Sequence, residues 1–179
     1  MKIAVFSSAS NIISKENLKL AQNIGEYLAE KKVSVLTGGC VGLPAVVAER
    51  AFHTGAETVA YYPDVSEKEL LKNIKIHNND IALHYSEKKF FNGFTNRSIR
   101  MIENADAAIV FNGRFGTLSE FSVAIEEGLQ VGVIEGTGGI TDEIKNLGTV
   151  VSRDFKNEVI FGKDYKLVID ELIEKIKNR

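Results

Sequence analysis

Hydrophobic and polar residues follow one another along the chain in blocks that predict strands and helices in turn. Short apolar runs predict strands buried on both faces, and residues 107–111 form the clearest of them. Longer segments with an apolar residue every three or four positions predict amphipathic helices, as in residues 165–177. The expected strands are residues 2–6, 33–36, 58–61, 81–83, 107–111 and 131–134, with a further extended piece near Val150. The expected helices are residues 15–31, 45–53, 67–73, 90–104 and 165–177, with others beginning near residues 117 and 141.

The alternation of strands and helices at this spacing is typical of βαβ units with right-handed crossovers. We therefore expect an α/β protein with a doubly wound, Rossmann-like parallel sheet and helices on both of its faces. No linker, internal repeat or low-complexity segment interrupts the pattern, so residues 1–179 are expected to form a single domain. Only residues 152–164 are weakly patterned.

Composition narrows the class of protein without assigning a function. Of the 179 residues, 44% are hydrophobic and 26% are charged, and the net charge is -2, as in an ordinary globular protein. This charge argues against a dedicated nucleic-acid binder. The first apolar run, residues 3–6, is too short for a signal peptide or a membrane span. We expect neither nucleic acid nor a membrane as a partner.

Cysteine and histidine usage excludes two further kinds of site. Cys40 is the only cysteine, so the chain forms no internal disulfide, and this fits a reducing, cytoplasmic location. His53, His77 and His84 stand apart in the sequence without the spacing of a metal-binding motif. We therefore expect no metal site, and a small turn residue is the simplest role for Cys40.

Glycine-bearing turns follow three of the expected strands, around Gly38, Gly113 and Gly138. The carboxyl ends of parallel strands lie at one edge of a sheet, so these turns should gather there. Backbone amides from several such turns form a polar pocket suited to a nucleotide or a sugar phosphate. The turn at residues 37–44 matches neither a dinucleotide-binding fingerprint nor a P-loop, so neither NAD binding nor NTP hydrolysis follows from it.

The turn at residues 112–120 carries the strongest candidate chemistry. Gly113 and Gly116 allow a ligand to approach the backbone, and a helix beginning near Thr117 directs its positive end at the same space. Glu120 permits two interpretations. Its carboxylate can face the pocket, or it can close a Thr-x-x-Glu capping box on its own helix.

Arg97 falls at the edge of an apolar helical stripe, beside Phe90 and Met101. Its stem can simply cover apolar surface while the guanidinium remains in solvent. Alternatively the guanidinium points into a cleft, where its planar shape suits phosphate or carboxylate. The residues alone leave both interpretations open.

Two motifs together resemble the LOG-like, "possible lysine decarboxylase" superfamily of Rossmann-type proteins. They are T-G-G-x-x-G-L at residues 37–43 and G-x-x-G-T-L-S-E at residues 113–120, the second preceded by an arginine-bearing helix and Ala-Asp-Ala. Gly-Thr-Gly-Gly at residues 136–139 resembles the branch that includes molybdenum-cofactor-carrier-like proteins. LOG enzymes cleave the N-glycosidic bond of nucleoside 5′-monophosphates. The resemblance implies that Glu120 and Arg97 are the catalytic residues, whereas no lysine lies in a pyridoxal-phosphate context.

The resemblance implies a nucleotide or another phosphate-bearing small molecule as the partner. The residues expected to hold its phosphate follow several of the strands: Ser8, Gly38, Gly39, Gly42, Gly113, Arg114, Gly116 and Thr117. Hydrolysis of this kind requires no cofactor. The resemblance also implies a homodimer packed through residues 90–104 and 121–128, although their phenylalanines would serve core packing equally well.

Three positions depart from the family motif. Asn112 replaces a proline, Arg114 replaces the second glycine, and Ser119 replaces the first glutamate of a frequent pair. Arg114 places a bulky cation where the ligand phosphate would meet bare backbone. These departures favour an alternative function, a non-catalytic carrier of a bound nucleotide or a molybdopterin-type ligand.

Overall fold

The computed structural model describes residues 1–10, 13–39, 41–77, 84–153, 155 and 158–178. Within them, seven parallel strands form one sheet in the order β4-β3-β2-β1-β5-β6-β7. The strands are β1 (Lys2–Phe6), β2 (Ser34–Thr37), β3 (Thr58–Tyr62), β4 (Glu87–Phe90), β5 (Ala107–Phe111), β6 (Gln130–Ile134) and β7 (Val159–Gly162). The helices are α1 (Lys15–Glu30), α2 (Leu43–His53), α3 (Glu67–His77), α4 (Phe94–Glu103), α5 (Phe115–Glu126), α6 (Ile144–Val150) and α7 (Tyr165–Lys177), with a 3₁₀ turn at Gly139–Glu143.

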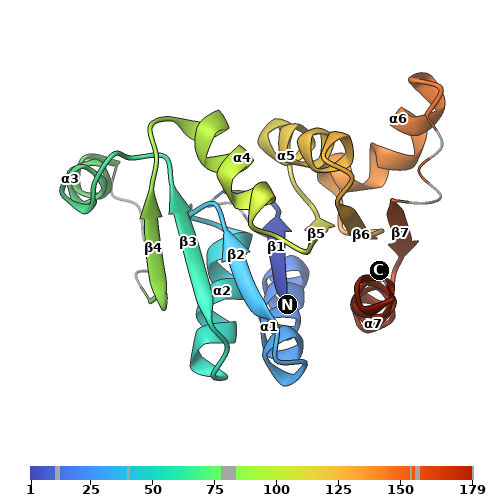
Figure 1. Cartoon of the computed structure of the whole chain (residues 1–179), viewed down its shortest axis with the longest axis horizontal. Helices are drawn as coiled ribbons and strands as arrows, with labels where there is room; N and C mark the ends of the chain where they lie inside the picture. Colours follow the sequence, from blue (N-terminus) through green and yellow to red (C-terminus); the bar gives the residue numbers. More distant parts are fainter. Residues whose placement is uncertain (11–12, 40, 78–83, 154, 156–157, 179) are drawn as a thin grey trace.

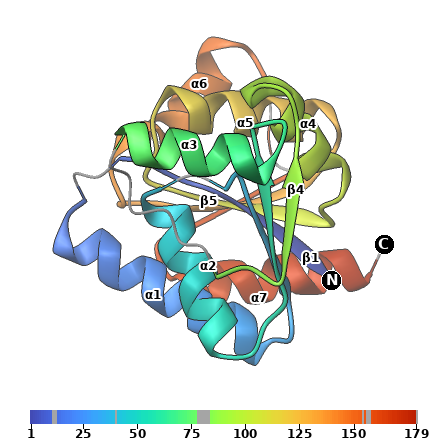
Figure 2. The ribbon, with the colours of Figure 1, turned by 90° about the vertical axis from the view of Figure 1, so that its left-hand side faces the viewer.

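The helices cover both faces of the sheet. Helices α1, α2 and α7 lie on one face, and α3, α4, α5 and α6 lie on the other (Figure 1, Figure 2). This arrangement confirms the predicted α/β class and the doubly wound parallel sheet. Every helix of the described chain is too short or too polar to span a lipid bilayer.

Residues of the central strands alternate between two large hydrophobic cores, one under each layer of helices, and a smaller third cluster includes Ala60 and Tyr62 of β3. Ile3 and Val5 of β1 pack with the helices on one face, whereas Ala4 and Phe6 pack into the core on the other. All five residues of β5 are buried. Successive side chains of a strand point to opposite faces, so an unbroken apolar run is what a central strand of this sheet requires.

The strand order reverses at β1. Strands β2, β3 and β4 extend the sheet on one side of β1, and β5, β6 and β7 extend it on the other. In open α/β sheets such a reversal leaves a crevice between the loops that follow the two central strands, and ligands bind in that crevice. The loops after β1 and β5 are therefore the place to look for a site.

The predicted helix at residues 90–104 is wrong in its first turn. β4 ends at Phe90, and α4 begins only after Gly93, whose φ is 88°. The Phe90 ring stacks on Tyr62 at 5.5 Å, and the Phe91 ring stacks on Tyr61 at 5.8 Å. These two phenylalanines thus belong to the edge of the sheet rather than to a helical stripe, and the Asn92-Gly93 turn that separates strand from helix went unrecognised.

In the C-terminal third, one prediction is wrong and one strand was not predicted. The piece near Val150, expected to be extended, is the last turn of α6, and the weakly patterned residues 152–164 contain strand β7. β7 has four residues and pairs only with β6, so its hydrophobic signal is short. The strand expected at residues 81–83 lies outside the described residues.

Burial predicts at which positions the truncation of a side chain lowers the free energy of unfolding. Leu36 of β2 is 1% exposed and Leu167 of α7 is 69% exposed. We expect Leu36→Ala to lower the free energy of unfolding by about 2–5 kcal/mol, because it removes buried methyl groups and leaves a cavity. Leu167→Ala, the matched control, should change it by less than about 0.5 kcal/mol. Urea denaturation followed by circular dichroism measures both, and equal losses would contradict the assigned core.

Candidate functional site

A cavity of about 170 Å³ lies at the reversal point of the sheet. The loop after β1 contributes Ser7, Ser8 and Ala9, and the start of α5 contributes the facing wall. Gly38, which follows β2, and Arg97, on α4, also line the cavity. The loops after β1, β2 and β5 therefore meet at this cavity as expected, whereas the glycine-rich turn at residues 136–139 does not line it.

The Arg97 side chain of α4 lies directly against Gly38. A β-carbon built at this position would lie 1.5 Å from Nη1 of Arg97 and 2.3 Å from its Cζ. Only a residue without a side chain leaves room for the guanidinium there. The glycine after β2 thus determines where the arginine of α4 is held.

Arg97 and Glu120 form an ion pair in the wall of the cavity. Nη1 of Arg97 lies 3.0 Å from Oε1 of Glu120, and the two side chains are 9% and 12% exposed. The Ser98 hydroxyl donates to the same oxygen at 3.2 Å. Both donors use Oε1, and no residue of the described chain donates to Oε2. The carboxylate is therefore held firmly in place while one oxygen remains available to a ligand.

Burial raises the pKa of the Glu120 carboxyl above its ordinary value. The positive charge of Arg97 and the hydrogen bonds from Ser98 and Arg97 act in the opposite direction, but burial has the largest effect. A carboxyl group with a raised pKa accepts and returns a proton closer to neutral pH than an exposed glutamate does.

The start of α5 rules out the capping-box interpretation of Glu120. The helix begins at Phe115 with Arg114 as its N-cap residue, so Thr117 lies inside the first turn and Glu120 in the second. The Glu120 carboxylate reaches α4 instead of the backbone of its own helix. Arg114 is exposed and lines the cavity beside Gly116.

Asn112 turns the chain from β5 into α5. Its φ is 53°, a left-handed conformation that asparagine tolerates and that the ring of a proline forbids. The Asn112 amide nitrogens bind Thr137: the backbone N–H donates to its hydroxyl at 2.7 Å, and Nδ2 donates to its carbonyl at 2.8 Å. Thr141 donates in turn to the Asn112 carbonyl. The turn after β5 is thereby fixed to the glycine-rich turn after β6.

Family comparison agrees with this architecture. Residues 1–161 match the SLOG cluster4 family. The chain belongs to this family. The assignment confirms the LOG-like resemblance of the two motifs, because the match includes both of them.

Individual relatives of this SLOG cluster4 protein are distant in sequence and close in fold. An uncharacterized protein of Archaeoglobus fulgidus is 26% identical over 132 residues, which cover 73% of this chain and 78% of the relative. The molybdenum cofactor binding protein of Rippkaea orientalis superposes with a TM-score of 0.76 at 18% identity, covering 98% and 96% of the two chains. The molybdenum cofactor carrier protein of Chlamydomonas reinhardtii gives 0.76 at 16% identity, covering 99% and 98%. At these identities the structural likeness supports the fold alone.

Most of the candidate site residues predicted from the sequence meet at the cavity. The cavity is lined by seven of the ten predicted residues: Ser8, Gly38, Arg97, Arg114, Gly116, Thr117 and Glu120. Gly39, Gly42 and Gly113 lie in the adjoining turns without lining it. Gly42 packs against the Ser8 carbonyl, where a β-carbon would come within 2.4 Å of the oxygen. These three glycines therefore act on the site through the path of the backbone.

Sequence patterns missed two polar residues at this site. Ser7 lines the cavity and donates its hydroxyl hydrogen to the Phe111 carbonyl, which ties the ends of β1 and β5 together. Ser98 binds Glu120. A serine directly after a strand is a usable signal for Ser7, whereas the contact of Ser98 depends on how α4 packs on α5. Cys40 lies outside the described residues.

Substitution at Gly38 tests how Arg97 is positioned. We expect Gly38→Ala to displace the guanidinium from Glu120 and to lower the free energy of unfolding by about 1–3 kcal/mol through overpacking. Gly116→Ala is the matched control, because a β-carbon there meets no atom within 4 Å. It should be neutral or slightly stabilising in urea denaturation. A Gly38→Ala protein as stable as the control would show that the guanidinium moves aside without cost, which would contradict the role of Gly38 in positioning it.

Proposed function

We propose that this protein is a nucleoside 5′-monophosphate phosphoribohydrolase, which cleaves the N-glycosidic bond to give a free base and ribose 5-phosphate. The observation that carries the proposal is the buried Arg97–Glu120 pair, which leaves Oε2 of Glu120 available in a cavity that the start of α5 also lines. Membership of the SLOG cluster4 family supports it, because the resemblance of the two motifs to LOG enzymes implies catalytic roles for Glu120 and Arg97.

The 5′-phosphate is assigned to the start of α5. Gly116 and Thr117 lie in its first turn, where backbone N–H groups have no partner within the helix. Arg114 adds a full positive charge at the same end, and its exposed guanidinium can close over an anion. Thr117 is buried against this space, and its hydroxyl can donate a further hydrogen bond.

Glu120 acts on the ribose carbon that holds the base. Glycosidic cleavage passes through a state with positive charge on the sugar ring, which a carboxylate beside that carbon stabilises. Water then adds to the same carbon: its oxygen forms the new bond, the bond to the base nitrogen breaks, and Glu120 accepts the proton released by water. The departing base takes up a proton from solvent as it leaves, and Glu120 afterwards returns its proton to solvent, so that the carboxylate is restored. Arg97 holds the carboxylate in position throughout.

The size of the cavity indicates which part of the substrate it encloses. Pockets that enclose a whole drug-sized ligand measure about 300–1,000 Å³. A cavity of about 170 Å³ accommodates the ribose 5-phosphate portion, so the base extends toward the mouth. Selectivity among bases therefore depends on residues outside the cavity.

The second candidate function is carriage of a phosphate-bearing cofactor such as a molybdopterin. Arg114 favours it, because a cation at the α5 terminus binds the phosphate of such a ligand as well as that of a nucleotide. The similar folds of the molybdenum cofactor proteins from Rippkaea orientalis and Chlamydomonas reinhardtii also support it. The residues present fit the phosphate end, and the pterin would project beyond the cavity.

Glu120→Gln separates these functions. The pure protein is incubated with a panel of nucleoside 5′-monophosphates, and free base is measured by chromatography. We expect the variant to release base about 10²–10⁴ times more slowly while binding the nucleotide nearly as well, because the amide cannot accept the proton. Glu127→Gln, an exposed change at the end of the same helix, is the control and should retain full turnover.

Turnover that survives Glu120→Gln would rule out the catalytic role of this residue. Absence of base release from the unchanged protein, together with a pterin or nucleotide that leaves only on denaturation, would replace the hydrolase with the carrier.

The raised pKa of Glu120 predicts an acid limit to turnover. The ionised carboxylate is the active form, so kcat/KM should fall as pH is lowered through the pKa of this group. The midpoint should lie above the ordinary glutamate value of about 4.3. Ser98→Ala removes a hydrogen bond that favours the ionised form, so it should move the midpoint to higher pH. Ser119→Ala, an exposed change on α5, should leave the pH profile unchanged.

A further inference from the structure

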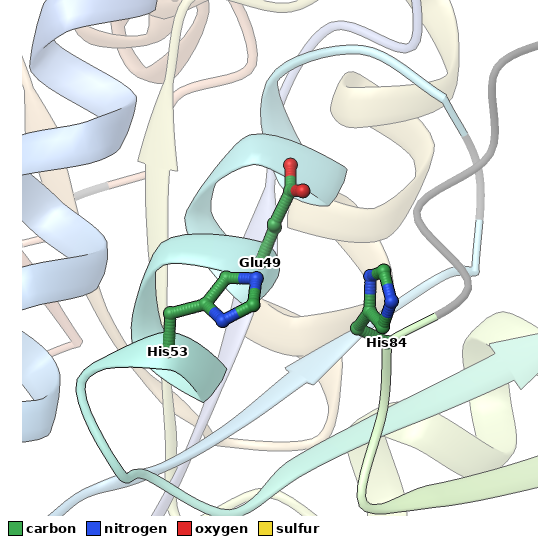
Figure 3. Close-up of side chains that lie close together, drawn as sticks. All are labelled: Glu49, His53 and His84. Atoms are coloured by element: carbon green, nitrogen blue, oxygen red, sulfur yellow. The ribbon is translucent and has the colours of Figure 1, made fainter.

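Two histidines and a glutamate that are far apart in sequence meet on the surface, away from the cavity. Glu49 and His53 lie on α2, and His84 lies just before β4 (Figure 3). All three are exposed, and one possible ligand atom from each lies within 4.8 Å of the other two. His53 and His84 stand apart in the sequence, but their ring centroids are 5.7 Å apart in the structure.

Local structure explains how this cluster forms. Glu49 and His53 are four residues apart on one helix, so their side chains project from the same face. His84 reaches that face because its ring stacks on Phe52 at 6.3 Å, with an angle of 30° between the planes. The His53 ring meets Phe52 edge-on at 5.7 Å. Phe52 thus holds both imidazoles on one side of α2.

The ligand atoms of the cluster have no competing partners in the described part of the chain. No side-chain hydrogen bond or ion pair among the described residues involves Glu49, His53 or His84, and the two histidine side chains make only ring contacts. The carboxylate oxygens and the unprotonated imidazole nitrogens therefore retain their lone pairs for a cation.

We propose that Glu49, His53 and His84 bind a divalent transition metal ion of the Zn²⁺ type. Imidazole nitrogen and carboxylate oxygen are ligands that Zn²⁺ accepts, and three protein ligands leave a fourth, tetrahedral position for water. Bonds of about 2.0–2.2 Å place tetrahedral ligand atoms roughly 3.3–3.5 Å apart. The present separations, at most 4.8 Å, exceed this by little more than 1 Å, which small rotations of exposed side chains supply.

The metal would act as a clamp rather than as part of the proposed hydrolase. Pro44, at the start of α2, lines the cavity, whereas His53 is the last residue of the helix. Nine residues of helix separate them by about 13 Å. A bound ion would instead join the end of α2 to the segment that leads into the edge strand β4. This inference is independent of the function proposed for Glu120.

Calorimetric titration of the full chain with Zn²⁺ tests the site. We expect one ion per chain, and His53→Asn, His84→Asn and Glu49→Gln should each weaken binding by at least about tenfold. Mg²⁺ should not compete, because it selects oxygen ligands. Circular dichroism establishes that each variant is folded, which its exposed position favours. Glu30→Gln, at the exposed end of α1, is the matched control for Glu49→Gln and should bind Zn²⁺ unchanged.

The imidazole resonances give a second and independent measurement. The chain has three histidines, so three ring signals can be followed by nuclear magnetic resonance as Zn²⁺ is added. The signals of His53 and His84 should shift together at one equivalent, and that of His77 should not. The proposal is overturned if no ion binds, if His77→Asn abolishes binding instead, or if Glu49→Gln has no effect. In the first case, contact with Phe52 alone accounts for the arrangement.

Discussion

The reversal of strand order at β1 is the constraint on which the rest of the site depends. Crossovers from β1 and β5 leave the sheet in opposite directions, so the loops after these two strands diverge and open a crevice between them. Ser7 bridges the ends of β1 and β5 with a hydrogen bond and forms the floor of that crevice. The start of α5 forms the wall, because the turn after β5 is fixed to the turn after β6 by the bonds between Asn112 and Thr137.

The stability of the fold does not explain why Arg97 and Glu120 are buried in this crevice. Transferring an arginine and a glutamate out of water costs several kcal/mol per ion, and an apolar pair of similar volume would often stabilise the fold equally well. Yet Gly38 leaves the space that Arg97 occupies, and Ser98 adds a second donor to Glu120. The backbone and its neighbours are thus arranged to keep two buried charges in fixed positions. Such preorganised charge is what a site of catalysis or anion binding requires.

The sequence predicted the centre of the fold better than its edges, for a physical reason. β5 and α7 have the boundaries that their apolar patterns predict, because a strand buried on both faces and an amphipathic helix have strong signals. β4 and β7 are four-residue edge strands that pair with a single neighbour, and β4 carries Glu-Lys-Lys. Half-exposed strands of this kind can hold polar residues, so hydrophobic pattern does not distinguish them from loops.

Sequence patterns were also of limited use for the candidate site, because they identify residues but not the contacts between them. Glu120 and Arg97 could each be singled out by motif, but their contact depends on the packing of α4 on α5, and the register of α4 is set by the turn at Gly93. The role of Gly38 could not be predicted from the sequence either, because it depends on the Arg97 guanidinium occupying the space that a side chain at residue 38 would fill. The cluster around His53 was missed because its third member comes from a different element.

The three departures from the family motif have different physical consequences, and only one of them affects the cavity. Ser119 is exposed on α5 and does not line the cavity, and Asn112 acts by fixing the turn. Arg114 alone faces the ligand space. A cation that binds phosphate equally in the ground state and the transition state raises affinity without raising kcat, and it retains a phosphate-bearing product as firmly as the substrate. Under the proposed function, Arg114 would therefore favour slow product release, whereas the buried Glu120 would favour bond cleavage. The balance between these two residues would then decide between the proposed hydrolase and the proposed carrier.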